Sequence, residues 1–386
     1  MANLKNTFFK WSSYFRSTGV LLLVVTIISL FLSNSSYSEN YIRFWTLERF
    51  SFSGHKADFL FIINDFLMAI FFLNVGLEIK RELIIGELSS FKKSITPIVA
   101  ALGGMLVPAL IYYVLNFNTE FEKGWGIPMA TDIAFAVAVL SLVGKHIPAG
   151  LKLFLMSLAI IDDLGAVIVI AVFYSQKLLM IYLLYAAIVF CLMFTMNLLK
   201  IKRLIFYLLL GIIAWYFILC SGVHATIAGV VTAFFIPLKD ISGIGSPLER
   251  LQNALNVPVD YLILPLFAMA NTAMVIEVNS FSEWFNMATV GVCLGLMLGK
   301  PIGIYYATKL VVNTNIGKLP EGCDFKKIAG AGMLGGIGFT MSIFILMLAL
   351  PNHEIQTTVK CAVLFSSLTM GIAGFVLLRK TTAATV

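Results

Sequence analysis

Long apolar runs recur along nearly the whole chain and are separated by short polar segments. Each run is close to the roughly 20 residues that an α-helix needs to cross a bilayer. The apolar residues are continuous instead of alternating, which excludes a transmembrane β-barrel. The pattern therefore predicts about twelve membrane-spanning helices, at about residues 15–33, 59–80, 95–116, 126–143, 151–175, 178–199, 204–219, 222–237, 254–275, 286–308, 327–350 and 357–378.

The composition supports this prediction. Of 386 residues, 60% are hydrophobic and only 12% are charged, whereas soluble proteins carry about 25% charged residues. This excludes a soluble enzyme and a disordered chain, and it favours an all-α polytopic membrane protein. The five cysteines are scattered without a CxxC pair, so we expect free thiols, no thiolate metal site and no resident cofactor.

The basic residues predict how the chain is oriented. Twenty of the 27 lysines and arginines fall in loops on the side of the N-terminus, six fall in the opposite loops, and Lys300 lies inside a span. By the positive-inside rule both termini face the cytoplasm. The first run follows basic residues as a signal peptide does, but it lacks a clear cleavage site, so we expect an uncleaved span. The net charge of +7 thus reports topology and does not indicate nucleic-acid binding.

The longest outer loop, residues 34–58, has an unusual pattern. Aromatic and polar residues alternate between about 42 and 54, as in a β-hairpin. Two interpretations stay open. The segment either anchors the chain in the aromatic belt of the membrane interface, or it contacts a second copy of the chain.

Four charged residues lie deep within predicted spans: Asp132, Asp162, Asp163 and Lys300. A charged residue at mid-membrane costs at least ~2.5–3.5 kcal/mol on the insertion scale, so such residues indicate a functional site. The structural alternative is that Lys300 only neutralises one aspartate, which would leave two buried carboxylates unpaired.

Two of the spans carry helix-breaking residues. Pro128 disfavours helix just before Thr131 and Asp132, and five glycines fall within 330–338. One interrupted span in each half of a chain is typical of an inverted-repeat transporter with a mid-membrane ion site. The alternative is that the glycines allow close helix packing. If the helices are broken, Asp132 can offset the partial positive charge of facing N-termini and Lys300 the negative charge of facing C-termini.

These groups suit an alkali cation. Carboxylates, the Thr131 hydroxyl and backbone carbonyls are hard oxygen ligands, which favour Na⁺ or Li⁺. Burial favours the protonated form of a carboxyl group, so one site binds either a proton or a cation. Such competition with alternating access gives antiport. We also hypothesise that a cation at Asp162 frees Lys300 to release a second proton.

Other classes of membrane protein fit less well. An intramembrane aspartyl protease needs Tyr-Asp and Gly-x-Gly-Asp motifs, which do not occur. A retinal protein using Lys300 would not need a carboxylate pair. A passive sodium channel would not move protons. A proton-coupled symporter of an organic substrate is the strongest alternative, although the site offers no clear groups for an organic anion.

Six motifs in this order along the chain resemble the bacterial NhaA family of Na⁺/H⁺ antiporters. They are FFLNVGLEIKREL (71–83), ATDIAF (130–135), IIDDLGA (160–166), LILPLFA (262–268), LGKPIG (298–303) and GGIGFTMS (335–342). The resemblance runs nearly from end to end. It implies one transporter domain over 1–386, with inverted core repeats at about 95–175 and 286–378 and interface spans at about 15–80 and 178–275.

The resemblance also implies roles. Asp163 would be the principal cation and proton carrier, Asp162 would pair with Lys300, and Thr131 and Asp132 would assist. It implies electrogenic, pH-regulated exchange of internal Na⁺ or Li⁺ for external protons in the bacterial inner membrane. The segment 41–58 would form the homodimer contact.

A pH-sensing cluster is implied at the inner ends of two spans. Glu78, Arg81, Glu82 and Arg250 match it, and His224 matches a histidine linked to pH response. The chain departs from the family where neutral amides replace titratable residues, at Gln252, Asn253 and Asn256. The alternatives are a solvated charge cluster for the first group and a hydrogen-bonded histidine at a helix break for His224.

Overall fold

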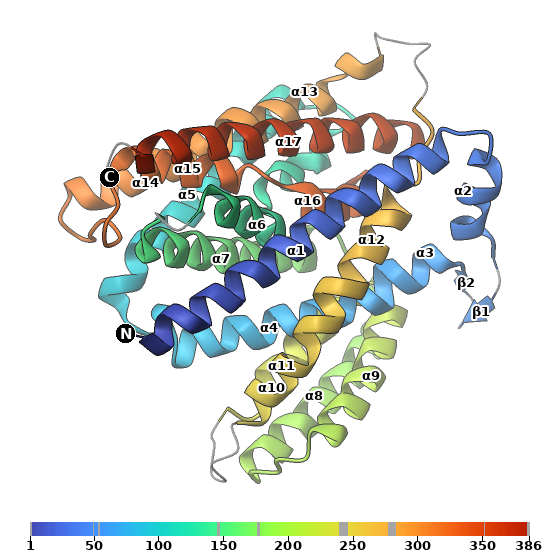
Figure 1. The fold of residues 1–386 in the computed structure, drawn as a ribbon. Coiled ribbons are helices and arrows are strands. Elements are labelled where there is room, and N and C mark those ends of the chain that lie inside the picture. The colour runs from blue at the N-terminus through green and yellow to red at the C-terminus, as the bar shows by residue number, and fades with distance from the viewer. Residues whose placement is uncertain are drawn as a thin grey trace. The chain divides into compact units, whose positions relative to one another are not determined.

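A computed structural model describes residues 2–48, 50–52, 55–144, 147–175, 178–238, 246–276, 283–350 and 352–383. Within these ranges the chain is helical apart from one two-stranded hairpin (Figure 1). Nine described helices are long and apolar enough to cross a membrane, and eleven spans result if each of two bent helix pairs counts as one. The predicted all-helical membrane fold is therefore confirmed.

Twelve spans were predicted, and the one without a counterpart among the eleven described spans is the eighth. The run at 222–237 forms an irregular loop followed by α10, Ile227–Phe235, which has only nine residues. Gly222 ends the preceding helix in the left-handed conformation, with φ of 85°. Hydropathy is averaged over a window of residues, so it did not detect that the first residues of this apolar run form a turn instead of a helix.

The described chain divides into two compact units. The first contains residues 1–27, 90–166 and 274–386. In it, a long helix, an interrupted helix and another long helix occur twice in that order. Its elements are most of α1 (Ala2–Ser33), α5 (Phe91–Leu115), η3 (Glu122–Met129), α6 (Ile133–Val143), most of α7 (Ala149–Phe173), η5 (Glu283–Phe285), α13 (Met287–Leu294), η6 (Gly295–Gly299), α14 (Lys300–Asn313), α15 (Phe325–Gly335), α16 (Phe339–Ala349) and α17 (His353–Ala383).

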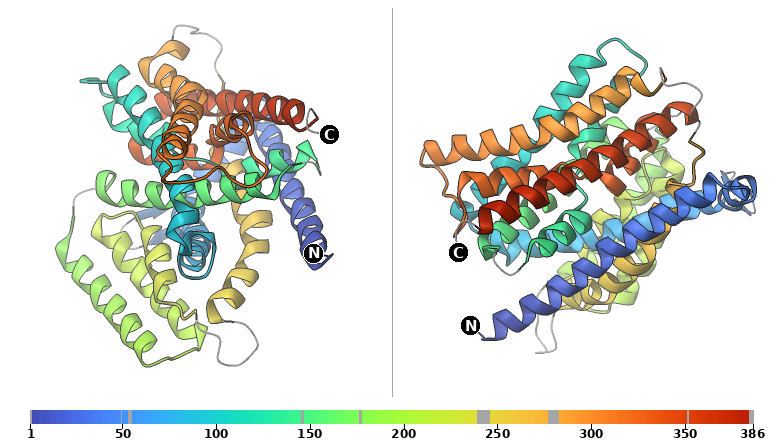
Figure 2. Two further views of the ribbon diagram at one scale, coloured as in Figure 1. Left: turned by 90° about the vertical axis from the view of Figure 1, so that its left-hand side faces the viewer. Right: turned by 45° about the horizontal axis from the view of Figure 1, so that its top comes forward.

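Helix packing in this first unit is tight where glycines meet. On α5 and α14, a Cβ at Gly103 would lie 2.5 Å from the carbonyl oxygen of Gly303, and a Cβ at Gly303 would lie closer still to the carbonyl oxygen of Gly103. Backbones approach this closely only when neither residue has a side chain. The contact holds the helix that begins with Lys300 against α5, while α15 lies along α17 (Figure 2).

The second unit contains residues 28–89 and 167–273. Buried side chains of α4, α8, α9, α10 and α11 form one of its apolar cores. Its elements are α2 (Ser38–Thr46), β1 (Phe50–Phe52), β2 (His55–Ala57), α3 (Phe59–Phe61), η1 (Ile62–Leu67), α4 (Met68–Ile84), η2 (Glu87–Ser89), α8 (Met180–Leu198), α9 (Leu204–Ser221), α10, α11 (Pro247–Pro258), η4 (Val259–Ile263) and α12 (Leu264–Asn271), with the ends of α1 and α7.

The predicted β-hairpin is shorter than expected. Phe50–Phe52 pairs antiparallel with His55–Ala57, but the preceding residues form helix α2. Tyr41 and Trp45 pack edge to face with ring centroids 6.0 Å apart, because residues four apart share one face of a helix. The expectation of strand over 42–45 was wrong because this spacing, and not the alternation, decides the local structure.

Some of the sequence predictions fall on residues that are outside the described ranges. The predicted hairpin includes three such residues, Arg49, Ser53 and Gly54. The basic residues counted for the orientation include three more, Lys145, Lys177 and Lys239.

Candidate ion site at two interrupted helices

Both predicted interruptions are present in the first unit. The 3₁₀-helix η3 ends at Met129, Ala130 and Asp132 are extended, and α6 begins at Ile133. The pair α15 and α16 is bent by 47° across residues 336–338. Pro128 in the first case and clustered glycines in the second explain why the helices stop here.

The two breaks contact each other through backbone groups. The amide of Asp132 donates to the carbonyl of Ile337 at 2.7 Å. The hydroxyl of Thr131 lies 3.0 Å from the carbonyl oxygen of Gly335, the last residue of α15. Groups left without partners where helices end are therefore satisfied across the crossing.

Asp132 caps two helices at once. Its Oδ1 accepts from the amide of Phe135 at 3.0 Å, in the first turn of α6. Its Oδ2 accepts from the amide of Thr340 at 3.2 Å and from the Thr340 hydroxyl at 2.5 Å, in the first turn of α16. The carboxylate thus lies at two helix N-termini, where negative charge is favourable.

Lys300 and Asp162 form a fully buried pair. Lys300 Nζ lies 2.9 Å from Asp162 Oδ2, and both side chains are 0% exposed. The ammonium also donates to the carbonyl of Met129, at the end of η3. Thr131 Oγ1 lies 2.7 Å from the same Oδ2 of Asp162, whereas Oδ1 accepts no hydrogen bond from the described residues.

Asp163 follows Asp162 on α7 and is also buried, with 2% of its surface exposed. Its charge interacts with that of Lys300. Adjacent residues on an α-helix point about 100° apart, so the two carboxylates have different surroundings. The structure thus brings Thr131, Asp162 and Lys300 into contact and joins Asp132 to them through the backbone.

The residues expected to sense pH lie in the second unit, mostly where α4 faces α11. Arg81 donates to Glu82 at 3.0 Å and to the amide oxygen of Gln252 at 3.2 Å. Half-buried Glu78 lies close enough to interact with the charge of Arg81. Arg250 is exposed. The structure therefore joins two of the five residues directly, and a neutral amide completes the contact.

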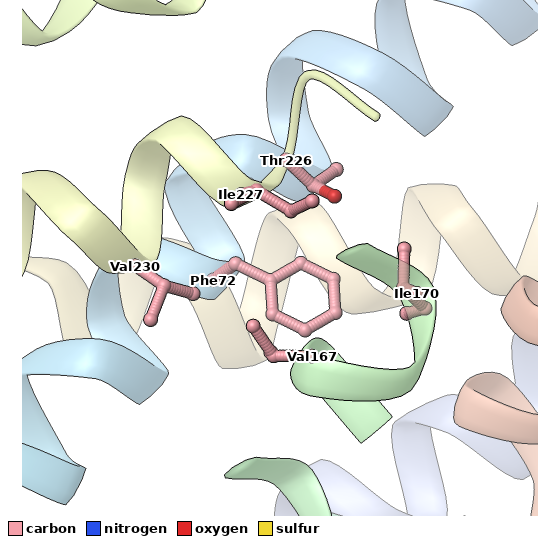
Figure 3. Close-up of a pocket in the computed structure, with 6 residues that line it drawn as sticks. All are labelled: Phe72, Val167, Ile170, Thr226, Ile227 and Val230. Carbon is pink, nitrogen blue, oxygen red and sulfur yellow. The ribbon is translucent and has the colours of Figure 1, made fainter. Parts of the chain in front are cut away.

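His224 has different surroundings. Its Nδ1 lies 3.3 Å from the hydroxyl of Thr226, in the loop before α10. The same loop borders a narrow apolar pocket of the second unit that is too small to hold a water molecule (Figure 3). Only one hydroxyl, that of Thr226, lines this pocket. It suits apolar packing better than a cation, and it is lined by Phe72, Val167, Ile170, Thr226, Ile227 and Val230.

Three further polar residues did not emerge from the sequence reasoning. Thr340 bonds Asp132, and the hydroxyl of Ser342 donates to the carbonyl of Ile127 at 2.8 Å. Lys80 donates to the carbonyls of Phe234 and Ile236, at the end of α10. The signal was available for the first two, because both are polar residues of the glycine-rich motif at 335–342.

Interrupted helices that meet at buried carboxylates, within a multi-pass membrane protein, define a secondary ion transporter. A family profile described as Na⁺/H⁺ antiporter 1 matches residues 10–378. The chain belongs to the NhaA family of Na⁺/H⁺ antiporters. The resemblance predicted from the motifs is confirmed, and the chain is a transporter and not an enzyme.

Several named relatives are similar over nearly their full length. The Na⁺/H⁺ antiporter NhaA 1 of Flavobacterium johnsoniae is 49% identical over 376 residues, which cover 97% of each chain. The antiporter NhaA of Flavobacterium psychrophilum is 47% identical over 364 residues, covering 94% of this chain and 93% of the relative. The antiporter NhaA of Vibrio cholerae is 45% identical over 382 residues, covering 98% of each.

Proposed function

We propose that this chain exchanges internal Na⁺ or Li⁺ for external protons across the bacterial inner membrane. The observation that carries this proposal is the buried pair of Asp162 and Lys300, with the Thr131 hydroxyl on the same carboxylate oxygen. Two adjacent buried carboxylates, one of which is paired to an ammonium, bind a proton or a small cation but not both at full occupancy.

Asp163 is the principal carrier in this proposal. When its carboxyl group loses a proton, the carboxylates of Asp163 and Asp162 bind a cation together with the Thr131 hydroxyl oxygen. The cation displaces the ammonium of Lys300 from Asp162, and Lys300 releases its own proton because an unpaired buried ammonium is unfavourable. Two protons leave for each cation bound, so the exchange carries net charge.

Alternating access follows from the crossing of the interrupted helices. Met129 binds Lys300 through its carbonyl, and the neighbouring Thr131 binds Asp162. A change in the occupancy of Asp162 therefore acts directly on the segment that joins η3 to α6. Asp132, already bound to two helix N-termini, supports the crossing electrostatically and need not leave these donors to bind the cation.

We further propose that pH regulates the exchange through Glu78, Arg81, Glu82, Arg250 and His224. Because Gln252 is neutral at every pH, its hydrogen bond to Arg81 cannot titrate. At this contact, the pH response therefore depends on the carboxylates around Arg81. We also propose a homodimer formed through the hairpin of Phe50–Phe52 and His55–Ala57, whose outer edges offer backbone groups for further pairing, and termini that face the cytoplasm.

The exchange is tested in inside-out vesicles with an acidified interior. Adding Na⁺ or Li⁺ to wild-type vesicles should release protons, and Asp163→Asn should abolish the release. Asp58→Asn is the matched control, because Asp58 caps α3 through Phe61 and asparagine caps as well. Proton release that persists in Asp163→Asn would refute the assignment of the carrier, and sodium flux without proton movement would indicate a channel.

The same assay between about pH 6 and about pH 9 tests regulation. The variant Gln252→Glu adds a titrating group beside Arg81, so its pH profile should differ from that of the wild type. Gln252→Met removes the hydrogen bond without adding a charge and is the control. Identical profiles for all three proteins would exclude a regulatory role for this contact.

A further inference from the structure

Two hydroxyl side chains of α16 reach across the crossing to the interrupted segment of the other helix. The Ser342 hydroxyl donates to the carbonyl of Ile127 at 2.8 Å. The Thr340 hydroxyl donates to Asp132 at 2.5 Å. Both side chains are buried, so water does not replace either bond if it is lost.

The bond from Ser342 exists because the helix stops. If the 3₁₀-helix η3 continued, the carbonyl of Ile127 would accept from the amide of Ala130. However, η3 ends at Met129 and the chain becomes extended, which leaves this carbonyl without a partner within its own helix. Ser342 supplies the missing donor from a different helix.

The two hydroxyl contacts lie on either side of Thr131 in the sequence, and Thr131 is the residue that contacts the carboxylate of Asp162. Ser342 holds the segment at Ile127, and Thr340 holds it at Asp132. Between them lies Thr131, whose hydroxyl is 2.7 Å from Asp162 Oδ2. A shift at either end of this short segment moves the Thr131 oxygen relative to Asp162, because residues 130–132 lie between two helices and have no helical hydrogen bonds to resist the shift. The bond from the Asp132 amide to Ile337 holds the same segment through its backbone.

Other hydroxyl groups of the first unit behave differently. Thr308 donates to Ile304 within α14 at 2.7 Å, and Ser141 donates to Ala138 within α6 at 2.7 Å. Such bonds to the preceding turn are the usual arrangement for serine and threonine in helices. Thr340 and Ser342 instead bridge two segments that are more than 200 residues apart in the sequence.

From this arrangement we propose that Thr340 and Ser342 are positioning residues, which hold residues 127–132 in register with α16 and so set the affinity for the transported cation. The proposal rests on the exchange function proposed above. Neither residue binds the cation itself. Each acts through the segment that carries Thr131, and therefore affects binding more than the maximal rate of exchange.

Sodium titration of proton release tests the proposal with Thr340→Val and Ser342→Ala. Each removes one buried hydrogen bond, so the apparent KM for Na⁺ and Li⁺ should rise about tenfold. The maximal rate should stay within about twofold, as expected when binding alone is lost. Thr340→Ser keeps the hydroxyl and should restore the wild-type KM. Thr308→Val and Ser141→Ala are matched controls and should leave it unchanged.

Binding measured directly separates this proposal from the proposed function. Purified protein is titrated with Li⁺ by calorimetry, and the dissociation constant should rise by the same factor in Thr340→Val and Ser342→Ala. If Thr340→Val does not accumulate, Ser342→Ala carries the test alone because it removes only one oxygen atom.

The proposal is overturned if KM and the dissociation constant of Ser342→Ala match those of the wild type. It is also overturned if Thr308→Val and Ser141→Ala raise KM and the dissociation constant as much as Thr340→Val and Ser342→Ala do. The same holds if Thr340→Ser has the KM of Thr340→Val. The exchange function fails separately, if wild-type vesicles release no protons on addition of Na⁺ or Li⁺. Calorimetry still compares the variants in that case.

Discussion

Lys300 Nζ lies 2.9 Å from Asp162 Oδ2, and neither side chain is exposed. The same ammonium binds the carbonyl of Met129, where η3 ends. One cation therefore neutralises a buried carboxylate and the negative end of an interrupted helix. Because both partners are buried, the pair is sensitive to the loss of either member.

Replacing Lys300 should destabilise the protein. Lys300→Gln leaves Asp162 buried without its ammonium, and breaking such a pair costs about 3–5 kcal/mol. Thermal or denaturant unfolding of the purified protein measures this loss. The double variant Lys300→Gln with Asp162→Asn removes the remaining charge and should recover most of the stability. Equal stability of the single and double variants would argue against a coupled pair.

Removing this pair should change how many protons are exchanged. A buried Asp162 without its ammonium would itself hold a proton, so the test uses the double variant Lys300→Gln with Asp162→Asn, in which only the carboxyl group of Asp163 can release a proton when a cation binds. Its exchange should therefore become electroneutral and insensitive to an imposed membrane potential, which potassium gradients with valinomycin can set in proteoliposomes. Exchange that still responds to the potential as the wild type does would eliminate Lys300 as the second proton carrier.

Thr131 should contribute to cation affinity through its hydroxyl. Thr131→Val keeps the shape of the side chain but removes the group that lies 2.7 Å from Asp162 and 3.0 Å from the carbonyl oxygen of Gly335. We expect the KM for Na⁺ to rise about tenfold or more. Thr131→Ser should behave like the wild type. Equal KM values for the valine and serine variants would show that the hydroxyl does not contribute to cation affinity.

Lys80 should matter for stability and not for exchange. Its ammonium donates to Phe234 at 2.7 Å and to Ile236 at 2.5 Å, at the end of α10. Lys80→Met leaves two carbonyls without this donor and should lower the free energy of unfolding by about 2 kcal/mol. Lys202→Met, at an exposed position before α9, is the control. A Lys80→Met protein as stable as this control would contradict the assignment.

Cys323 should react slowly with alkylating reagents. It lies in the loop before α15, where burial, more than any nearby charge, raises the pKa of its thiol to about 11. An unperturbed thiol has a pKa of about 8.5. Because the thiolate is the reactive form, alkylation at about pH 8 should be at least about tenfold slower in the folded than in the unfolded protein.

Peptide mass spectrometry can follow Cys323 separately from the other four cysteines. The rate in the folded protein should keep rising as the pH approaches the raised pKa. A rate that already levels off near the unperturbed pKa of about 8.5 would mean that the loop does not shield the thiol.

The sequence alone determined the features that are local along the chain. Continuous apolar runs predicted the membrane helices, Pro128 and the glycines of 330–338 predicted that two of them are interrupted, and the charged residues within the runs predicted the buried site. Hydropathy and helix breaking depend on a residue and its near neighbours, which explains why these expectations agree with the structure. The motifs likewise indicated the family.

Only the tertiary structure decided which groups are partners. Asp132 meets Thr340, and Ser342 meets Ile127, across more than 200 residues of sequence, and no periodicity encodes such a pairing. Packing also decided local questions that the pattern left ambiguous, since burial of Trp45 on a helical face made α2 a helix instead of a strand. Long-range contacts form only when helices pack, so the site's charges were readable in the sequence but the hydrogen bonds that hold them were not.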